Sequence, residues 1–265
     1  MKELFIRALS GLVYVIIIIC GTLYSKESFY IIFYILMMFC LYEFKNLIKL
    51  SYKWTIIVAS LIFLYSVKTT YIEPKYLEFL LITSLFIPII YQLFKSKTPL
   101  KSSKLGHYFL AIAYIALPFS MLIQIPFINN SYHPKIIISI FILIWISDTF
   151  AYLVGSAIGK TKLYKKVSPN KTIEGALGGL VAALIGTNLI ATYYCTEIST
   201  INWMVIASIV FTFGLLGDLI ESKFKREAGV KDSSNFIPGH GGFLDRLDSV
   251  IFASPFAYVF IHIIT

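Results

Sequence analysis

The stretch KIIISIFILIWISDTFAYLVGSAI at 135–158 decides the fold class of this chain. At 1.5 Å per residue, a helix of this length crosses the roughly 30 Å hydrocarbon core of a bilayer. After Lys135 at its start, the only charged side chain in the run is Asp148. The stretch therefore predicts a transmembrane helix with an acid inside it.

Comparable apolar runs occur along the whole chain. Hydrophobic residues make up 58% of it and charged residues only 14%, against about 25% charged residues in an ordinary soluble domain. No soluble fold of this size could bury so much apolar surface, so the solvent is expected to be lipid. We predict an all-α, polytopic integral membrane bundle of about nine transmembrane helices, at 4–23, 28–47, 54–70, 77–95, 105–126, 135–158, 174–195, 202–221 and 249–265.

The first run could also be a signal peptide, but no small-residue cleavage site follows it, and we interpret it as an uncleaved anchor. The three cysteines stand alone in or beside apolar runs. Their spacing fits neither a disulfide framework nor a metal site, so they are expected to be small buried residues. They are Cys20, Cys40 and Cys195.

The basic residues predict the orientation. The net charge of +9 suggests nucleic acid, or an anionic membrane and substrate, as a partner. With the N-terminus in the cytosol, nearly all of the 23 basic residues fall on the cytoplasmic side. This distribution favours the membrane, and we expect no nucleic-acid partner. The basic residues that fall outside the cytoplasmic side are Lys26, Lys68, Lys75 and Lys135.

We expect a single integral membrane domain over 1–265. Its first part, 1–140, contributes spans without a motif. Its second part, 145–250, holds nearly all the polar residues that suit chemistry and is the expected catalytic core.

The end of the eighth predicted span presents three polar groups together. Asp218, Ser222 and Lys225 lie three or four residues apart, so a helix places them on one face. The alternative is an ordinary solvated helix end. Asp218 argues against that alternative, because it follows an apolar run and is costly there without a partner or ion.

A glycine-rich turn and a pair of acids follow. Gly239, Gly241 and Gly242 surround His240, and successive amides in such turns can bind anions, although many such segments are only turns. Asp245 and Asp248 are three residues apart and share a helix face. Oxygen ligands without His or Cys suit Mg²⁺. The alternative is a solvated pair of acids balanced by Arg246 and nearby lysines.

The segment before the seventh predicted span is also polar. Thr172 is expected to cap that helix, with Glu174 in its first turn. Lys171 is misplaced for the helix dipole and suits an anion ligand better. Gly175 and Gly179 have the spacing that permits close helix packing. For Asp148, a polar packing site and a functional site are equally good interpretations.

Together these groups suit phosphoryl or nucleotidyl transfer, in which the protein mainly positions substrates and neutralises charge. The sequence has no hydrolytic triad, zinc signature or Walker A loop. Three alternatives stay open: an ion-coupled transporter, a CTP-dependent lipid or polyprenol kinase, and a structural scaffold.

The order and gaps of these residues resemble the signature of phosphatidate cytidylyltransferases, also called CDP-diacylglycerol synthases. The similarity covers about 145–250, where Asp148 with Ala151-Tyr152 and the block 168–175 also resemble the family. Asn170 stands where the family often has lysine. The signature itself reads Ser222-Lys223-Phe224-Lys225-Arg226, Lys231-Asp232 and Pro238-Gly239-His240-Gly241-Gly242-Phe243-Leu244-Asp245-Arg246-Leu247-Asp248.

The resemblance implies that CTP and phosphatidate react, with Mg²⁺, to give CDP-diacylglycerol and pyrophosphate. It also suggests a homodimer. From the basic residues we expect the active site at the cytoplasmic face, and from a compact chain without a targeting segment we expect a bacterial inner (plasma) membrane. As a hypothesis, Asp218, Asp245 and Asp248 bind the metal. The phosphate ligands would be Lys171, Lys225, Arg226 and Lys231, assisted by Ser168, Thr172 and Ser222. His240 and Arg246 are further candidate catalytic residues, and Asp148, Asp232, Gly241 and Gly242 are further candidate substrate-binding residues.

Overall fold

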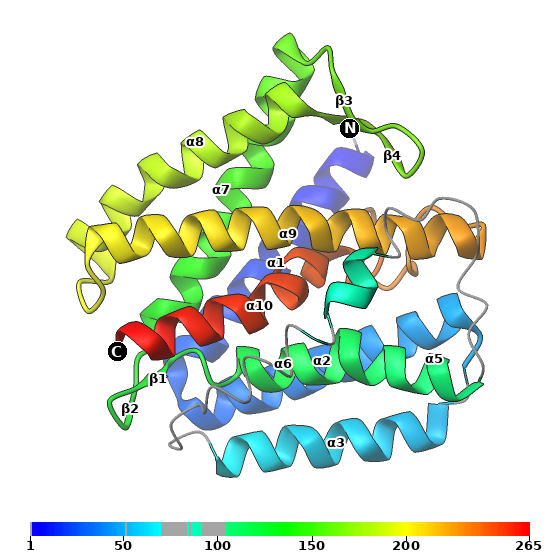
Figure 1. Cartoon of the computed structure of the whole chain (residues 1–265), viewed down its shortest axis with the longest axis horizontal. Coiled ribbons are helices and arrows are strands. Elements are labelled where there is room, and N and C mark those ends of the chain that lie inside the picture. The colour runs from blue at the N-terminus through cyan, green and yellow to red at the C-terminus, as the bar shows by residue number, and fades with distance from the viewer. Residues whose placement is uncertain (1, 51, 70–83, 85, 92–103) are drawn as a thin grey trace.

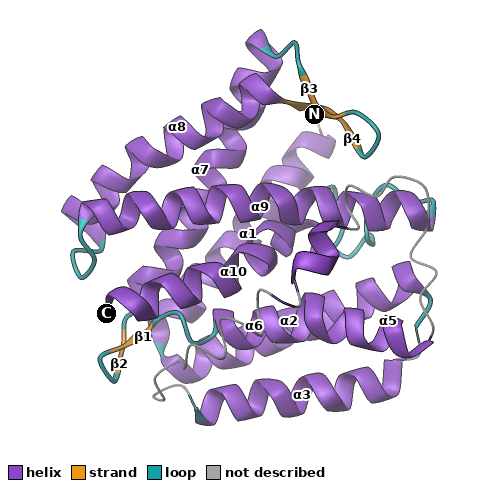
Figure 2. Ribbon diagram, viewed as in Figure 1, coloured by secondary structure: helices purple, strands orange, loops and turns teal. Residues whose placement is uncertain are grey.

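The computed structural model describes residues 2–50, 52–69, 84, 86–91 and 104–265. Long helices dominate this part of the chain (Figures 1 and 2). They are α1 (Lys2–Tyr24), α2 (Lys26–Ile48), α3 (Tyr52–Lys68), α7 (Pro134–Ile158), α8 (Ile173–Leu189), α9 (Thr200–Ala228) and α10 (Leu244–Ile264).

Two of the predicted spans change helix type along their length. The fifth consists of α5 (Lys104–Ala111), the π-helical turn η1 (Ile112–Ala116) and α6 (Leu117–Leu122). The seventh continues from α8 into a second π-helical turn, η2 (Ile190–Tyr194). Most of the fourth predicted span, 77–95, lies outside the described residues.

Two small antiparallel hairpins interrupt the helices. The first joins β1 (Phe127–Ile128) to β2 (Ser131–Tyr132) before α7. The second joins β3 (Lys162–Tyr164) to β4 (Ser168–Thr172) and leads directly into α8.

The helices have the length and surface of membrane spans. Within the described residues, seven helical stretches are long and apolar enough to cross a bilayer. The outer face of α8 exposes a large apolar side chain every fourth residue, with Leu177 57%, Val181 55%, Ile185 65% and Leu189 61% exposed. Such a stripe is stable only against lipid. The chain is therefore an all-α, multi-pass membrane protein, as the sequence predicts.

The ends of the last two spans differ from the prediction. α9 continues to Ala228 and α10 begins at Leu244, so the polar connection is only 229–243. The predicted boundaries stopped where charged residues began. The helix continues there because charges four residues apart pair along it, as Lys225 does with Glu221.

α9 and α10 pack side by side, and α2 lies against both near the polar connection (Figure 1). The rings of Phe44, Tyr114 and Phe224 form a cluster between α2, η1 and α9, with centroids 5.1 to 5.4 Å apart. Each such ring pair contributes roughly 0.5–1.5 kcal/mol beyond its buried area. Because Phe44 and Phe224 adjoin Glu43 and Lys225 in the sequence, the cluster fixes the helix segments that carry these two charged residues.

α7 and α8 pack closely along their length, as the glycine spacing of α8 predicts. Gly179 lies so close to α7 that a β-carbon on it would be 2.6 Å from the backbone oxygen of Ser147. Gly175 faces Ala151 and Gly155 in the same way. This packing is the small-residue contact that allows membrane helices to approach without a hydrophobic driving force.

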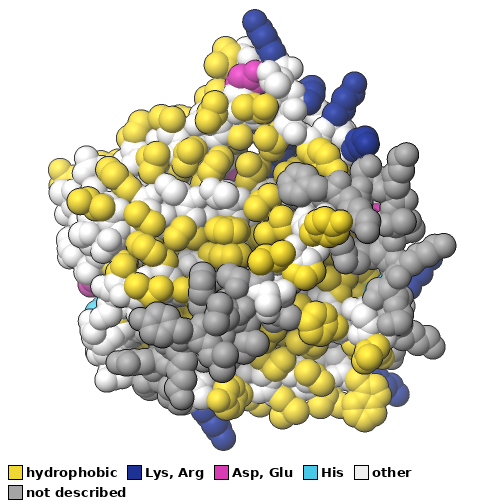
Figure 3. Space-filling model, viewed as in Figure 1, with side chains coloured by type: hydrophobic (Ala, Val, Ile, Leu, Met, Phe, Trp, Pro, Cys, Tyr) yellow, Lys and Arg dark blue, Asp and Glu magenta, His cyan; other side chains and the backbone are white. Residues whose placement is uncertain are grey.

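Figure 3 shows apolar side chains over most of one face. Most of the Lys and Arg side chains visible there gather at the top and right, where Figure 1 places the β3–β4 hairpin and the C-terminal end of α9. The polar connection and the start of α10 lie at the same end of the bundle.

Gly179→Ala should lower the thermal stability of the detergent-solubilised protein, because the new methyl group meets the backbone of α7. A cost of ~1–3 kcal/mol is expected. Gly186→Ala is the matched control on the same helix, since its methyl group would meet only the flexible end of Ile146, at 3.1 Å. Equal melting temperatures for the two variants would contradict this view of the α7–α8 contact.

Candidate active site

Two cavities meet at the end of the bundle that carries the polar connection. The polar cavity has a volume of about 450 Å³ and the apolar cavity about 430 Å³. Their shared wall consists of Ile144, Asp148, Asp218 and Ser249, from α7, α9 and α10. Asp148, which the sequence left between two interpretations, is exposed to both cavities.

Most of the acids that the sequence singled out line the polar cavity. Two basic side chains and a histidine lie among them, and Tyr14 and Gly11 of α1 complete one side. The predicted site residues in this wall are Asp148, Asp218, Lys225, Asp232, His240, Asp245, Arg246 and Asp248.

The apolar cavity lies between α7, α8 and α9. Side chains such as Tyr152, Val210 and Leu215 form most of its wall, and Lys171 and Thr172 of β4 provide a polar end. Thr172 accepts a hydrogen bond from the amide of Gly175 at 3.1 Å, which confirms it as the cap of α8.

Asp218 is held by two of the residues that the sequence assigned to the site. The Lys171 ammonium forms an ion pair with Oδ2 of Asp218. Ser222 Oγ donates to Oδ1 of Asp218 at 3.3 Å, so these two do share a helix face as predicted. A cation from β4 and a hydroxyl one turn along α9 thus compensate this half-buried acid.

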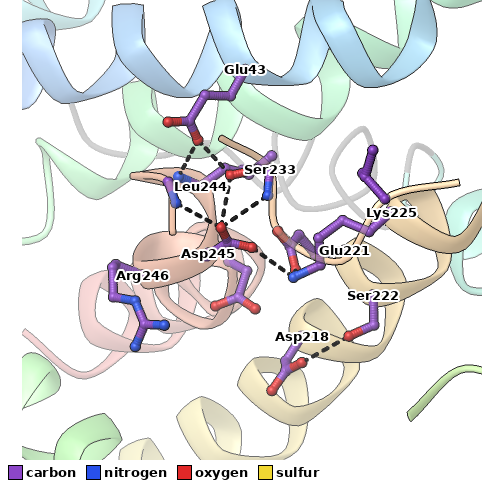
Figure 4. A network of polar contacts seen from close by, with 12 residues as sticks. Glu43, Asp218, Glu221, Ser222, Lys225, Ser233, Leu244, Asp245 and Arg246 are labelled. Carbon is purple, nitrogen blue, oxygen red and sulfur yellow. Dashed lines mark hydrogen bonds and ion pairs between the residues drawn. The ribbon is translucent and has the colours of Figure 1, made fainter. Parts of the chain in front are cut away.

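Lys225 lies between two carboxylates (Figure 4). Its Nζ is 2.6 Å from Oδ1 of Asp245 and also pairs with Glu221, which is fully buried. Removing one partner of such a buried pair is costly, because it leaves an uncompensated charge. Lys225 therefore links α9 to the start of α10 as well as lining the polar cavity.

Asp245 is almost completely bonded. Its Oδ2 accepts from the amides of Gly242 at 2.7 Å and Ser233 at 3.0 Å, and the Ser233 hydroxyl oxygen also lies 3.0 Å away. With Lys225 on Oδ1, this carboxylate joins the polar connection to α10.

The turn before α10 depends on glycines. Gly239 and Gly241 have φ values of +75° and +83°, which side-chain-bearing residues rarely adopt. Ile237 and Gly241 pair across the turn, and this presents His240 to the polar cavity. The Nδ1 of His240 lies 2.9 Å from Ser10 Oγ of α1. Partial burial, Arg246 and Arg7 all lower the pKa of His240.

Some predicted residues do not line either cavity. Arg226 is exposed and donates to the carbonyl of Val230 at 3.3 Å, beyond the end of α9, and Lys231 is exposed in the connection. Ser168 is half-buried at the start of β4. Gly241 and Gly242 belong to the turn before α10 and line neither cavity. Their proposed contacts with substrate stay predictions.

Two acids at the site were missed by the sequence reasoning. Glu43 of α2 and Glu221 of α9 are both fully buried, and both lie against the residues just described. Each stands in or beside an apolar run, which is the signal that singled out Asp148. The prediction that 1–140 contributes only spans without a motif therefore did not include Glu43.

The donor chemistry of the polar cavity fits a hard divalent cation. Asp148, Asp218 and Asp248 offer only oxygen ligands, and Lys171 already lies against Asp218 as a cation would. In the described part of the chain, no three His, Cys, Asp or Glu side chains converge on one point. Mg²⁺ tolerates this arrangement, because it commonly binds one or two carboxylates and takes its other ligands from substrate phosphates and water.

The chain matches the family described as "Cytidylyltransferase family" over residues 5–264. It belongs to this family. The cytidylyltransferase match therefore includes α1 and α2 as well as the segment with the signature, in agreement with a site that draws residues from both.

Several curated relatives carry the name phosphatidate cytidylyltransferase. The protein of that name from Bacillus subtilis is 42% identical over 155 residues, which cover 58% of this chain and 57% of the relative. The protein from Staphylococcus saprophyticus is 42% identical over 55% of this chain and 55% of the relative. The protein from Staphylococcus haemolyticus is 46% identical over 43% of this chain and 44% of the relative. The chain thus spans about half the length of the curated relatives it matches.

Acidification should destabilise the turn around His240. Its lowered pKa means that the folded state prefers the neutral ring, whereas the unfolded chain takes up a proton from about pH 6.5 downward. Stability is therefore lost as the pH falls below that value. The melting temperature should fall less between pH 7.5 and 5.5 in His240→Gln than in the original protein. His107→Gln, which changes a histidine that lines neither of the two cavities, is the control, and a pH dependence in His240→Gln as steep as in that control would refute the assignment.

Proposed function

We propose that this protein transfers the cytidylyl group of CTP to phosphatidate and releases pyrophosphate, in an Mg²⁺-dependent reaction. The observation that carries the proposal is the meeting of the polar and apolar cavities at Asp148 and Asp218. One cavity suits a charged, soluble substrate and the other suits a lipid. The names of the curated relatives supply the reaction.

The apolar cavity suits phosphatidate. It lies between α7, α8 and α9, so acyl chains can lie along apolar side chains such as Val210 and Leu215. Lys171 and Thr172 at the polar end would receive the phosphate headgroup. Placed there, the headgroup would be beside Asp218, at the boundary with the polar cavity.

The polar cavity suits a nucleotide that arrives with divalent cations. Five aspartates and only two permanently charged basic residues, Lys225 and Arg246, line it. Lys225 is already paired with Glu221 and Asp245. A bare triphosphate would be repelled by this wall, whereas Mg²⁺ held between the triphosphate and the aspartates would offset that repulsion. Asp218 and Asp248, with Asp148 beside them, are the proposed ligands, and the ion would supply neutralisation of phosphate charge. Asp245, which the sequence also assigned to the metal, already bonds Lys225, Ser233 and Gly242 and would instead hold the start of α10.

The reaction needs no general base. An oxygen of the phosphatidate phosphate, which is already anionic, forms a bond to the α-phosphorus of CTP. The bond from that phosphorus to the bridging oxygen of the β-phosphate breaks, and pyrophosphate leaves. The difficulty is to bring two polyanions together, and Lys171 and Arg246 on opposite sides of the shared wall would lower that repulsion.

The location follows from the same arrangement. The basic residues near the site support a cytoplasmic active site with the N-terminus on the same side. The bacterial relatives support a bacterial plasma membrane. The homodimer stays a prediction from the resemblance.

The products distinguish this function from its nearest alternative. Purified protein with CTP, phosphatidate and Mg²⁺ should release pyrophosphate and form CDP-diacylglycerol, because the α-phosphorus is the one attacked. A CTP-dependent lipid kinase would release CDP, and a transporter would move solute in vesicles without consuming nucleotide. Detection of CDP without pyrophosphate would refute the proposal.

Asp218→Asn should reduce turnover on the order of a hundredfold, because it removes a negative ligand from the proposed metal site. Asp245→Asn should reduce turnover too, because it breaks the bonds that hold the first turn of α10, which leads to Asp248. Chelation with EDTA should abolish the activity, and added Mg²⁺ should restore it. Only Asp245→Asn should also lower the melting temperature markedly, since Asp245 bonds Lys225, Ser233 and Gly242.

Glu227→Gln is the matched control for these variants, because Glu227 is an exposed acid of α9 that lines neither cavity. It should retain full activity. Full activity in Asp218→Asn would defeat the metal assignment, and full activity in Asp245→Asn would contradict the role of Asp245 in holding the start of α10.

A further inference from the structure

Glu43 of α2 is a fully buried carboxylate from the part of the chain where the sequence showed no motif. It lies about two hundred residues before its partners in the sequence. Figure 4 shows it reaching from α2 toward Ser233 and the start of α10. Such a group is costly to bury unless hydrogen bonds compensate its charge.

Four donors surround the Glu43 carboxylate. Oε1 accepts from the hydroxyl of Ser234 at 2.7 Å and from the amide of Phe243 at 2.9 Å. Oε2 accepts from the hydroxyl of Ser233 at 2.7 Å and from the amide of Leu244 at 2.8 Å. An ionised carboxylate has about four acceptor positions, so this set saturates it.

Two of these donors are the amides at the start of α10. The first amides of a helix have no partner within the helix. The residue at the cap position, Phe243, has no polar side chain and makes no side-chain capping bond. Glu43 therefore caps α10 from another helix, and the positive end of the helix dipole favours its charge.

The same contact is continuous with the wall of the polar cavity. The Ser233 hydroxyl also lies 3.0 Å from Oδ2 of Asp245, which in turn pairs with Lys225. Gly242 lies against both Glu43 and Ser233, and a β-carbon there would collide with both side chains. The absence of a side chain at Gly242 is thus a condition for this arrangement.

We propose that Glu43 is a positioning residue for the transfer reaction. By holding Ser233, Ser234 and the start of α10 against α2, it fixes the connection 229–243 and the first turn of α10. Those segments supply Asp232, Ile237, His240, Asp245, Arg246 and Asp248 to the polar cavity. The catalytic part of this inference rests on the proposed function, and the structural part does not.

Glu43→Gln separates this role from simple filling of space. Glutamine has nearly the same volume, but its amide group is itself a donor and cannot accept from the amide and hydroxyl that face it. A space-filling role predicts no effect. A positioning role predicts that part of the hydrogen-bond set is lost while the α2 packing stays. Glu27→Gln, at the exposed start of the same helix, is the matched control.

The decisive experiment compares these variants by hydrogen exchange and by kinetics. In Glu43→Gln, the amides of Phe243 and Leu244 should exchange roughly tenfold faster or more, and turnover should fall by a similar factor. The KM for phosphatidate should stay unchanged, because no residue of 229–243 lines the apolar cavity. General loss of structure would raise that KM as well. Exchange and turnover equal to those of Glu27→Gln would overturn the proposal.

Two further measurements apply if Glu43→Gln does not fold or if the unmodified protein is inactive. If Glu43→Gln does not fold, Ser234→Ala removes one donor to the same carboxylate, and severalfold faster exchange at Phe243 is expected. Unchanged exchange in Ser234→Ala would overturn the proposal. If the unmodified protein does not convert CTP and phosphatidate, the proposed function fails, and the exchange measurement alone decides the role of Glu43.

Discussion

Carboxylates buried where the helices leave the lipid impose the main constraint on this structure, because each must be matched by a cation or by several donors. Asp218 is matched by Lys171 and Ser222. Glu221 and Asp245 share Lys225. Among the described residues, Glu43 has no cationic partner in its hydrogen-bond set and is matched by two amides and two hydroxyls. The ends of α2, α9 and α10 are therefore tied together by charge compensation as much as by apolar packing.

This compensation explains why a short, glycine-rich connection can be well defined at a membrane surface. Ser233 bonds to Glu43 and Asp245, and the amide of Gly242 bonds to Asp245. Apolar packing supports the same place, since Phe39 of α2 stacks on Phe243 with ring centroids 4.6 Å apart. A site held in this way on helix ends is more rigid than one carried by a free loop.

The shared wall separates two cavities that differ in polarity. The proposed lipid and nucleotide substrates differ in polarity, and the fold provides a cavity that suits each. In this fold, α7 and α9 separate an apolar space from an acidic one, and Asp148 and Asp218 stand between them. In the cytidylyltransferase family to which the chain belongs, this arrangement suits a reaction that joins a membrane phosphate to a soluble one.

The sequence by itself determined the membrane architecture, the cap at Thr172, the close packing at Gly179 and the polar cluster from Asp218 to Asp248. These features depend on hydrophobic runs and on spacing along one helix, which are local properties. Only the tertiary structure decided that Asp218 pairs with Lys171, that Asp245 is nearly saturated, and that Glu43 caps α10. Those outcomes depend on which helices pack together, and a pairing between residues some two hundred positions apart leaves no periodic trace in the chain.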